Sequence, residues 1–274
     1  MNHPLPLTVL LIAAFAALAA CTADAGTGHL SDPSGAEGDE EVVEVEEGDA
    51  PAEAGQWLDR IEARAAEIDT LTARVRYERI QMLLGDKQTR FGQLTYDAGP
   101  PARFHVHFDR LAVHDELQPD RHVRYIFDGR WLAERRDNER VFIRRELVAE
   151  DEVGQDLLRL GEGPFALPLD LEKQTVLERF TVELVEEDEP AVENTVMLRL
   201  TPLPNVEIDE TLIEMWYDRD TLLPAQVRSV DERDQTESVI RLGNVETGVE
   251  VEEDVFDTQP PGEAGWQVEV HGLE

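Results

Sequence analysis

The feature that most constrains the fold of this chain is the alternation of apolar with polar side chains in two segments, residues 103–109 and 122–128. The apolar members of the two segments are Phe104, Val106, Phe108, Val123, Tyr125 and Phe127. Successive side chains of a β-strand point to opposite faces, so this alternation predicts two strands with one apolar and one polar face. Such strands bury one face of a sheet and leave the other to solvent.

The turns and the remaining apolar segments predict an antiparallel sheet. Asp128-Gly129 is a strong signal for a tight hairpin, and the strand that leaves it, 130–135, leads through Asp137-Asn138 into another at 140–145. Further strands are predicted at 73–84, 88–96, 176–185, 195–201, 212–217, 224–230 and 237–242. Roughly ten short strands make a sheet that must curl.

Two segments have helical character. Apolar residues recur every three to four positions at Trp57, Leu58, Ile61, Ala65 and Ile68, which predicts a helix with one apolar face. Residues 153–160 predict a second helix, which is followed by a Gly-Pro break and the apolar run 165–169. This insertion is expected to interrupt the sheet and cover its concave face. The predicted fold class is α+β, mostly β.

The N-terminus predicts export and lipidation. Residues 7–20 are apolar except for Thr8, and the run is shorter than the about 20 residues that span a bilayer but typical of a signal peptide. Leu18-Ala19-Ala20-Cys21 resembles the lipobox of bacterial lipoproteins, in which the cysteine sulfur is acylated before cleavage on its N-terminal side. Cys21 is the only cysteine, so no internal disulfide explains it. Residues 1–20 are therefore predicted to be a lipoprotein signal peptide, and Cys21 the lipidated first residue of the mature protein.

Charge defines the next segment and excludes several partners. Residues 22–54 carry eleven Asp and Glu, no Lys or Arg and no aromatic residue, so region 21–54 is predicted to be a lipidated cysteine followed by a disordered spacer. A docking patch for a basic partner is the alternative. The formal net charge of the chain is −35, so neither nucleic acid nor an anionic lipid surface is an expected partner. Residues 55–274 are predicted to form one domain.

Several local patterns follow one another in the order of a known family. They are the helix 57–68, the strand 73–84, Gly92-Gln93-Leu94-Thr95-Tyr96 with Pro101 and Phe104, Asp128-Gly129-Arg130-Trp131-Leu132, Pro164-Phe165-Ala166-Leu167, Trp216-Tyr217-Asp218, Leu223-Pro224, Asn244-Val245 and Asp254-Val255-Phe256 before Pro260-Pro261-Gly262. In this order they resemble the periplasmic lipoprotein carriers and outer-membrane lipoprotein receptors of the Lol system, the LolA- and LolB-like proteins. The resemblance extends over most of residues 55–270.

The resemblance implies a curled antiparallel half-barrel with an N-terminal helix and a helical lid over an apolar cavity that shields acyl chains from water. The lipid-binding cavity residues expected from it are Phe104, Val106, Phe108, Tyr125 and Phe127, with Phe165 and Leu167 in the lid. An ordinary core between sheet and helix explains any one of them equally well. The implied function is that of a membrane-anchored lipoprotein that faces the periplasm, at the outer membrane rather than the inner, and binds acyl chains in lipoprotein sorting or transfer.

Two features test how far the resemblance extends. Carriers often have an arginine before the proline that precedes the aromatic strand, where this chain has Pro100, and Arg103 is only an approximate substitute. Receptors use a protruding apolar loop, for which Leu111, Val113 and Leu117 are a candidate. An ordinary surface loop is the preferred interpretation of these three residues.

An enzyme is not expected. His105 and His107 lie two apart, therefore on one face of a strand, and such a pair can hold a metal. Other ligands have no fixed spacing, and histidines opposite an apolar face follow from alternation, so no metal, cofactor or catalytic residue is predicted. A cell-envelope sensor or interaction module on the same fold is the alternative to acyl-chain binding, and a metal-dependent enzyme is the least favoured hypothesis.

Overall fold

A computed structural model describes residues 52–119, 121–150, 171–186, 191–204, 206, 208, 210–231, 233 and 235–273. They belong to one compact unit, Glu47–Glu274. Its helices are α1 (Ala52–Ala65), α2 (Lys173–Leu177) and the 3-10 helix η1 (Glu253–Phe256). Its strands are β1 (Thr70–Gln81), β2 (Asp86–Asp97), β3 (Arg103–Val113), β4 (Glu116–Gln118), β5 (Val123–Phe127), β6 (Trp131–Arg136), β7 (Val141–Glu146), β8 (Phe180–Val185), β9 (Thr195–Pro202), β10 (Leu212–Asp218), β11 (Pro224–Asp231), β12 (Thr236–Thr247) and β13 (Gln267–His271). Cys21, Phe165 and Leu167 lie outside the described residues.

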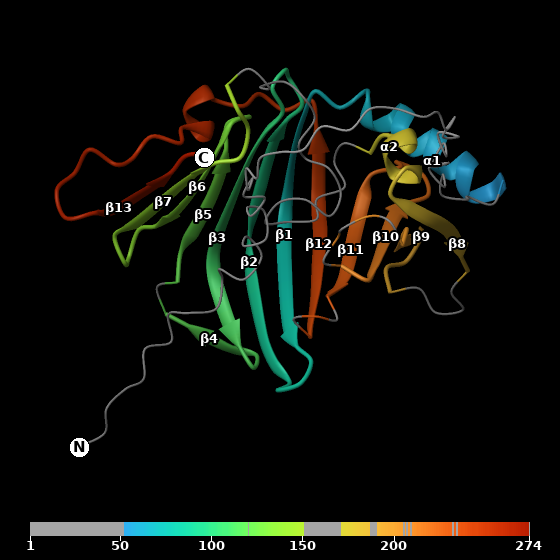
Figure 1. Cartoon of the computed structure of the whole chain (residues 1–274), viewed down its shortest axis with the longest axis horizontal. Helices are drawn as coiled ribbons and strands as arrows, with labels where there is room; N and C mark the ends of the chain where they lie inside the picture. The colour runs from blue at the N-terminus through green and yellow to red at the C-terminus, as the bar shows by residue number, and fades with distance from the viewer. Residues whose placement is uncertain are drawn as a thin grey trace, which may run out of the picture. The chain divides into compact units, whose positions relative to one another are not determined.

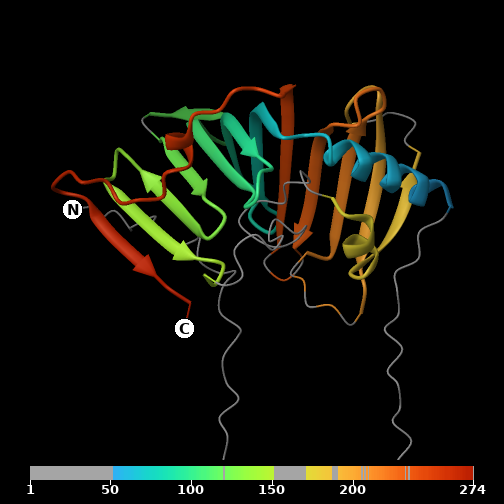
Figure 2. The same ribbon diagram turned by 90° about the horizontal axis from the view of Figure 1, so that it is seen from above.

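The described strands form one 13-stranded sheet in the order β13-β7-β6-β5-β3-β2-β1-β12-β11-β10-β9-β8, with β4 beside β3 (Figure 1). Every pairing is antiparallel except that of β13 with β7, which is parallel. The pair β1 and β12 joins a first half, β2 to β7, to a second half, β8 to β11. Seen from above, the sheet is curled (Figure 2). The prediction of a mostly-β, curled antiparallel sheet with an N-terminal helix is confirmed.

Two predicted elements have different boundaries in the structure, and both differences involve a helix that packs on the sheet. The strand predicted at 176–185 is wrong in its first residues, because α2 occupies them and β8 begins only at Phe180. An ion pair connects α2 to α1, because Lys173 Nζ lies 2.6 Å from Asp59 Oδ1. The predicted N-terminal helix begins earlier than residue 57, so residues 52–54 of the expected spacer belong to α1. Ala54 is fully buried, and alanine has the highest helix propensity of all residues.

Two large apolar clusters lie on the same face of the sheet, which we call the inner face. Strand register connects them through one row across β1, β12, β11, β10 and β9, namely Tyr77, Ile240, Val227, Met215 and Leu198. In the second half, helices α1 and α2 cover this face, and Leu58, Ile61 and Val176 pack with residues of β8 to β11. Burial of each large aliphatic side chain contributes about 1.5–3 kcal/mol, so these contacts hold the helices in place.

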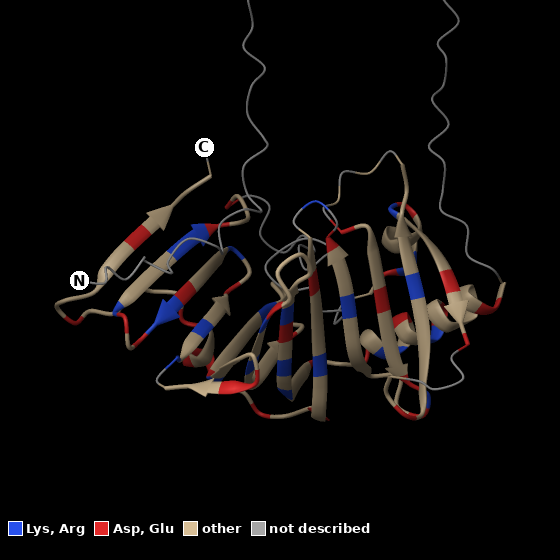
Figure 3. Ribbon diagram, turned by 90° about the horizontal axis from the view of Figure 1, so that it is seen from below, with Lys and Arg blue, Asp and Glu red and all other residues tan. Residues whose placement is uncertain are grey.

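The opposite, outer face carries cross-strand ion pairs. Figure 3 marks the charged positions along the strands. Glu214 of β10 lies 2.8 Å from Arg199 of β9 and 2.8 Å from Arg228 of β11. Arg228 also lies 3.0 Å from Glu237 of β12. Opposite charges on neighbouring strands contribute roughly 0.2–1 kcal/mol per pair. Such pairs are typical of a sheet face that is exposed to water.

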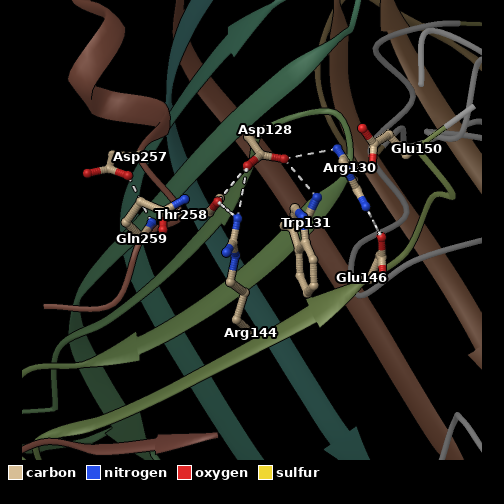
Figure 4. Close-up of polar contacts among 9 residues, drawn as sticks. All are labelled: Asp128, Arg130, Trp131, Arg144, Glu146, Glu150, Asp257, Thr258 and Gln259. Atoms are coloured by element: carbon tan, nitrogen blue, oxygen red, sulfur yellow. Dashed lines mark hydrogen bonds and ion pairs between the residues drawn. The ribbon is translucent and has the colours of Figure 1, made fainter. Parts of the chain in front are cut away.

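The C-terminal segment crosses the outer face of the first half and ends as an added edge strand. The hydroxyl of Thr258 donates to the carboxylate of Asp128, and Arg144 Nη2 donates to the same hydroxyl at 3.1 Å (Figure 4). Asp128 Oδ1 also accepts the backbone N–H of Arg130 and of Trp131, at 2.9 and 2.7 Å. The hairpin turn after β5 is thereby tied to the tail that leads into β13.

Candidate functional site

The predicted lipid-binding residues lie on the inner face of the first half of the sheet. Strand register aligns them in rows with residues of neighbouring strands. One row is Leu71, Tyr96, Phe104, Phe127 and Leu132, and the next is Ala73, Leu94, Val106 and Tyr125. Alternation along each strand therefore brings five predicted residues from β3 and β5 into one apolar cluster with β1, β2, β6 and β12.

The five side chains are buried against one another. Phe104, Val106, Phe108, Tyr125 and Phe127 have exposed fractions of 3%, 2%, 0%, 6% and 4%. The ring centroids of Phe104 and Phe127 lie 5.5 Å apart, and Phe108 meets Tyr125 edge-on at 6.4 Å. The prediction that these residues share a site is consistent with this packing, while the predicted lid residues Phe165 and Leu167 lie outside the described part of the chain.

A small crevice lies beside this cluster, between the end of α1 and the strands. Its walls are Ile61, Ala65, Ile68, Leu71, Tyr96, Tyr217, Leu222 and Pro224. It has room for about one water molecule. None of the five predicted residues borders this crevice.

Polar groups limit the apolar cluster at one end. Glu134 is buried opposite Tyr125, and Arg136 Nε donates to Glu134 Oε1 at 2.7 Å. Burial raises the pKa of Tyr125, so its hydroxyl stays protonated at physiological pH. Tyr77 lies in the same region, with its hydroxyl 3.4 Å from Ser238 Oγ. The sequence interpretation missed this polar end, although Glu134 and Tyr77 have the inner-face parity of their strands.

The histidines lie on the outer face, as alternation predicts, and His105 and His107 are half-buried. Their rings stack with centroids 6.2 Å apart. Burial lowers the pKa of His105 to about 4, and burial also lowers the pKa of His107. Among the described residues, no group of three or more side chains is placed to hold a metal ion.

The two family features occupy other positions than expected. Arg103 lies on the outer face, where it binds Asp97 and Glu253 and stacks over Phe256. The segment that contains Leu111, Val113 and Leu117 is a strand pair, because β3 continues to Val113 and β4 returns beside it. Leu111 is buried on the inner side, so the prediction of a loop here is wrong, and only Leu117 is exposed.

Comparisons with known proteins find only solved structures of low similarity to this chain. No family model matches the chain, and no curated protein matches it. The solved structures to which it is similar include an uncharacterized conserved protein from Thermus thermophilus, with 10% identity, a TM-score of 0.46, and coverage of 81% of this chain and 99% of the other.

Two further solved structures are similar to this chain at comparable identity. A LolA superfamily protein from Nitrosomonas europaea is 11% identical, with a TM-score of 0.33 and coverage of 73% of this chain and 97% of the other. The Pseudomonas aeruginosa MucA/MucB complex contains a chain 18% identical, with a TM-score of 0.43 and coverage of 75% of this chain and 61% of the other. At such identities and TM-scores, any function must rest on this chain's own side chains.

Membrane association cannot be assigned to a helix of the described region. Neither α1 nor α2 combines the length and apolar character required to cross a bilayer. The predicted lipid anchor at Cys21 lies outside this region and stays a prediction.

Proposed function

We propose that this protein is a membrane-anchored lipoprotein of the cell envelope that binds acyl chains on the inner face of its sheet. The observation that supports this most directly is the continuous apolar cluster contributed by β1, β2, β3, β5, β6 and β12. The described helices α1 and α2 pack on the other half of the same face. An apolar face of this extent within a chain of net charge −35 suits a ligand that is itself apolar.

Burial of an acyl chain supplies ample free energy for such binding. Each methylene group removed from water contributes about 0.8 kcal/mol, so a palmitoyl chain offers roughly 10 kcal/mol before costs. Those costs include separating Phe108 and Tyr125 from the groups that now cover them, and ordering the flexible chain. The net affinity is therefore expected in the micromolar range rather than far below it.

The predicted lipidation of Cys21 places this binding face near a membrane. Two or three acyl chains make release from the bilayer negligible, and the predicted acidic spacer holds the folded unit away from the surface. We propose that the protein faces the periplasm from the outer membrane and receives acyl chains of lipoproteins or other lipids in sorting or transfer.

A pair of substitutions on one strand tests the binding face. Leu242 and Val239 are both half-buried residues of β12, but Leu242 packs on the inner-face cluster and Val239 lies on the outer face. Titration of the unit Glu47–Glu274 with a fluorescent fatty acid is expected to show saturable binding. Leu242→Gln should weaken it about tenfold, because a polar group enters the apolar site, and Val239→Gln should leave it unchanged.

The unit is suited to this experiment because both large clusters and every described strand pairing lie within it. Circular dichroism verifies that each variant is folded. Absence of saturable binding by the folded wild type would refute the proposal. Isolation of a stable protein partner without any bound lipid would instead support the alternative of an envelope sensor or interaction module.

A further inference from the structure

Two half-buried arginines of the inner face lie on neighbouring strands beside the apolar cluster. Arg79 of β1 and Arg90 of β2 are half-buried, and neither has an ion-pair or hydrogen-bond partner for its side chain in the part of the chain that the structure describes. On the outer face, by contrast, Arg199 and Arg228 are paired with carboxylates. In a chain of net charge −35, two cations on an apolar face that the described residues leave unpaired require an explanation.

Strand register brings these two arginines together. Arg90 is directly opposite Tyr77, and Arg79, two residues after Tyr77 on the same face of β1, is the diagonal neighbour of Arg90. Diagonal neighbours on one face lie about 7–8 Å apart, within the combined reach of two guanidinium groups. On its other side Arg90 is opposite Leu111 of β3. The two cations therefore sit at the edge of the apolar cluster.

The charges around this pair leave a positive balance. The phenol of Tyr125 is near enough for Arg90 and Arg136 to influence its ionisation. The carboxylate that faces the same region is Glu134, and Arg136 neutralises it through the 2.7 Å hydrogen bond. Arg136 also binds Glu139 at 3.0 Å, so the charges of Arg79 and Arg90 stay uncompensated by the described residues.

We infer that Arg79 and Arg90 bind the acidic headgroup, a carboxylate or a phosphate, of an amphiphile whose acyl chain lies over the inner-face cluster. This inference rests on the proposed function and specifies its ligand class. Guanidinium groups bind carboxylates and phosphates through paired, charge-assisted hydrogen bonds. Phe108 lies next to Tyr77, with ring centroids 6.1 Å apart, so a chain leaving the headgroup enters apolar surroundings at once.

The test compares an ionised probe with its neutral counterpart. The unit Glu47–Glu274 is titrated at pH 8 with the fluorescent fatty acid cis-parinaric acid and with its methyl ester. The wild type should bind the acid about tenfold more tightly than the ester. The double variant Arg79→Gln/Arg90→Gln should bind both probes equally, with the affinity of the wild type for the ester. Competition by a monoacyl phosphatidic acid and by an unlabelled fatty acid of the same chain then distinguishes phosphate from carboxylate preference, and a neutral monoacylglycerol is the control.

Two control variants separate a specific site from general charge. Arg74→Gln removes an exposed arginine on the outer face of β1, and Arg145→Gln removes a half-buried inner-face arginine at the far end, opposite Leu132. Both should retain the preference for the acid. Arg90→Lys keeps the positive charge and should retain part of the preference for the acid. This variant replaces the double variant in the test if the double variant does not fold.

Equal binding of acid and ester by the wild type would overturn the headgroup site while leaving acyl-chain binding intact. Loss of the preference in Arg74→Gln or Arg145→Gln would overturn the assignment to Arg79 and Arg90. Failure of the wild type to bind either probe would overturn both this inference and the proposed function.

Discussion

At the scale of single residues, Gly92 shows how closely the first half of the sheet is packed. A β-bulge after Phe108 shifts the register of β3 against β2, and the backbone of β3 then approaches Gly92. A Cβ atom at this position would overlap the carbonyl oxygen of His107. The sequence resemblance includes this glycine only as part of a pattern. The close approach of β3 explains why the position requires a residue without a side chain.

Gly92→Ala is expected to lower the free energy of unfolding by about 2–4 kcal/mol, because backbone rather than a flexible side chain must move. Urea unfolding followed by circular dichroism measures this loss. Gly243→Ala in β12 is the matched control, since no atom lies within contact of its Cβ, and its effect should stay within about 0.5 kcal/mol. Equal effects of the two substitutions would contradict the close approach.

His105 predicts a pH dependence of stability. Burial lowers its pKa from 6.5 to about 4 in the folded state, so the folded protein favours the neutral ring. The contribution of the buried neutral ring to the free energy of unfolding is fully present above pH 6.5. It is lost as the pH falls toward 4, and the loss amounts to about 3 kcal/mol.

The measurement is the free energy of unfolding of the wild type and of His105→Gln between pH 4 and pH 7. The difference between the two should shrink as the pH falls, because the variant has no ring to protonate. His271→Gln, at an exposed residue of β13, should follow the wild type at every pH. A constant difference across this range would mean that the ring is not buried in its neutral form.

At the scale of elements, sequence alternation located the strands that carry a local signal and missed those that depend on distant partners. The strands around Phe104 and Tyr125 were predictable, because every second residue is apolar and buried on one face. β13 was not, because all its side chains are exposed and only its backbone pairs with β7. The end of α2, Val176 and Leu177, was predicted as the start of a strand, since this short apolar run has no helical period of its own.

A buried hydrogen bond of Thr258 is one of the contacts that attach the C-terminal segment. Thr258 is 2% exposed, and its hydroxyl joins Asp128 to Arg144. Thr258→Val should lower the free energy of unfolding by about 1–3 kcal/mol, because the Asp128 carboxylate loses a donor in a buried position. Chemical denaturation measures this effect, and Thr211→Val, at an exposed hydroxyl, should cost less than about 0.5 kcal/mol. A neutral Thr258→Val would show that the other contacts of the tail hold it in place.

At the scale of the whole molecule, the inner face of the sheet carries two apolar clusters that have different surroundings. Helices α1 and α2 complete the cluster over β8 to β11 as an ordinary core. The cluster around Phe104 and Tyr125 has a polar end instead, where Arg79 and Arg90 lie without partners among the described residues. The grouping of the apolar residues was predictable from alternation, whereas this polar end emerges only when strand register brings β1, β2 and β6 together.

The most direct test of acyl-chain binding is photolabelling of the unit Glu47–Glu274 with a fatty acid that carries a diazirine near its chain end, followed by mass spectrometry of the labelled peptides. Acyl-chain binding on the inner face predicts saturable labelling that excess unlabelled fatty acid abolishes. The labelled side chains should be those of β3 and β5 on this face, Phe104, Val106, Phe108, Tyr125 and Phe127. Labelling confined to outer-face residues such as His105 and His107, or unaffected by the competitor, would contradict it.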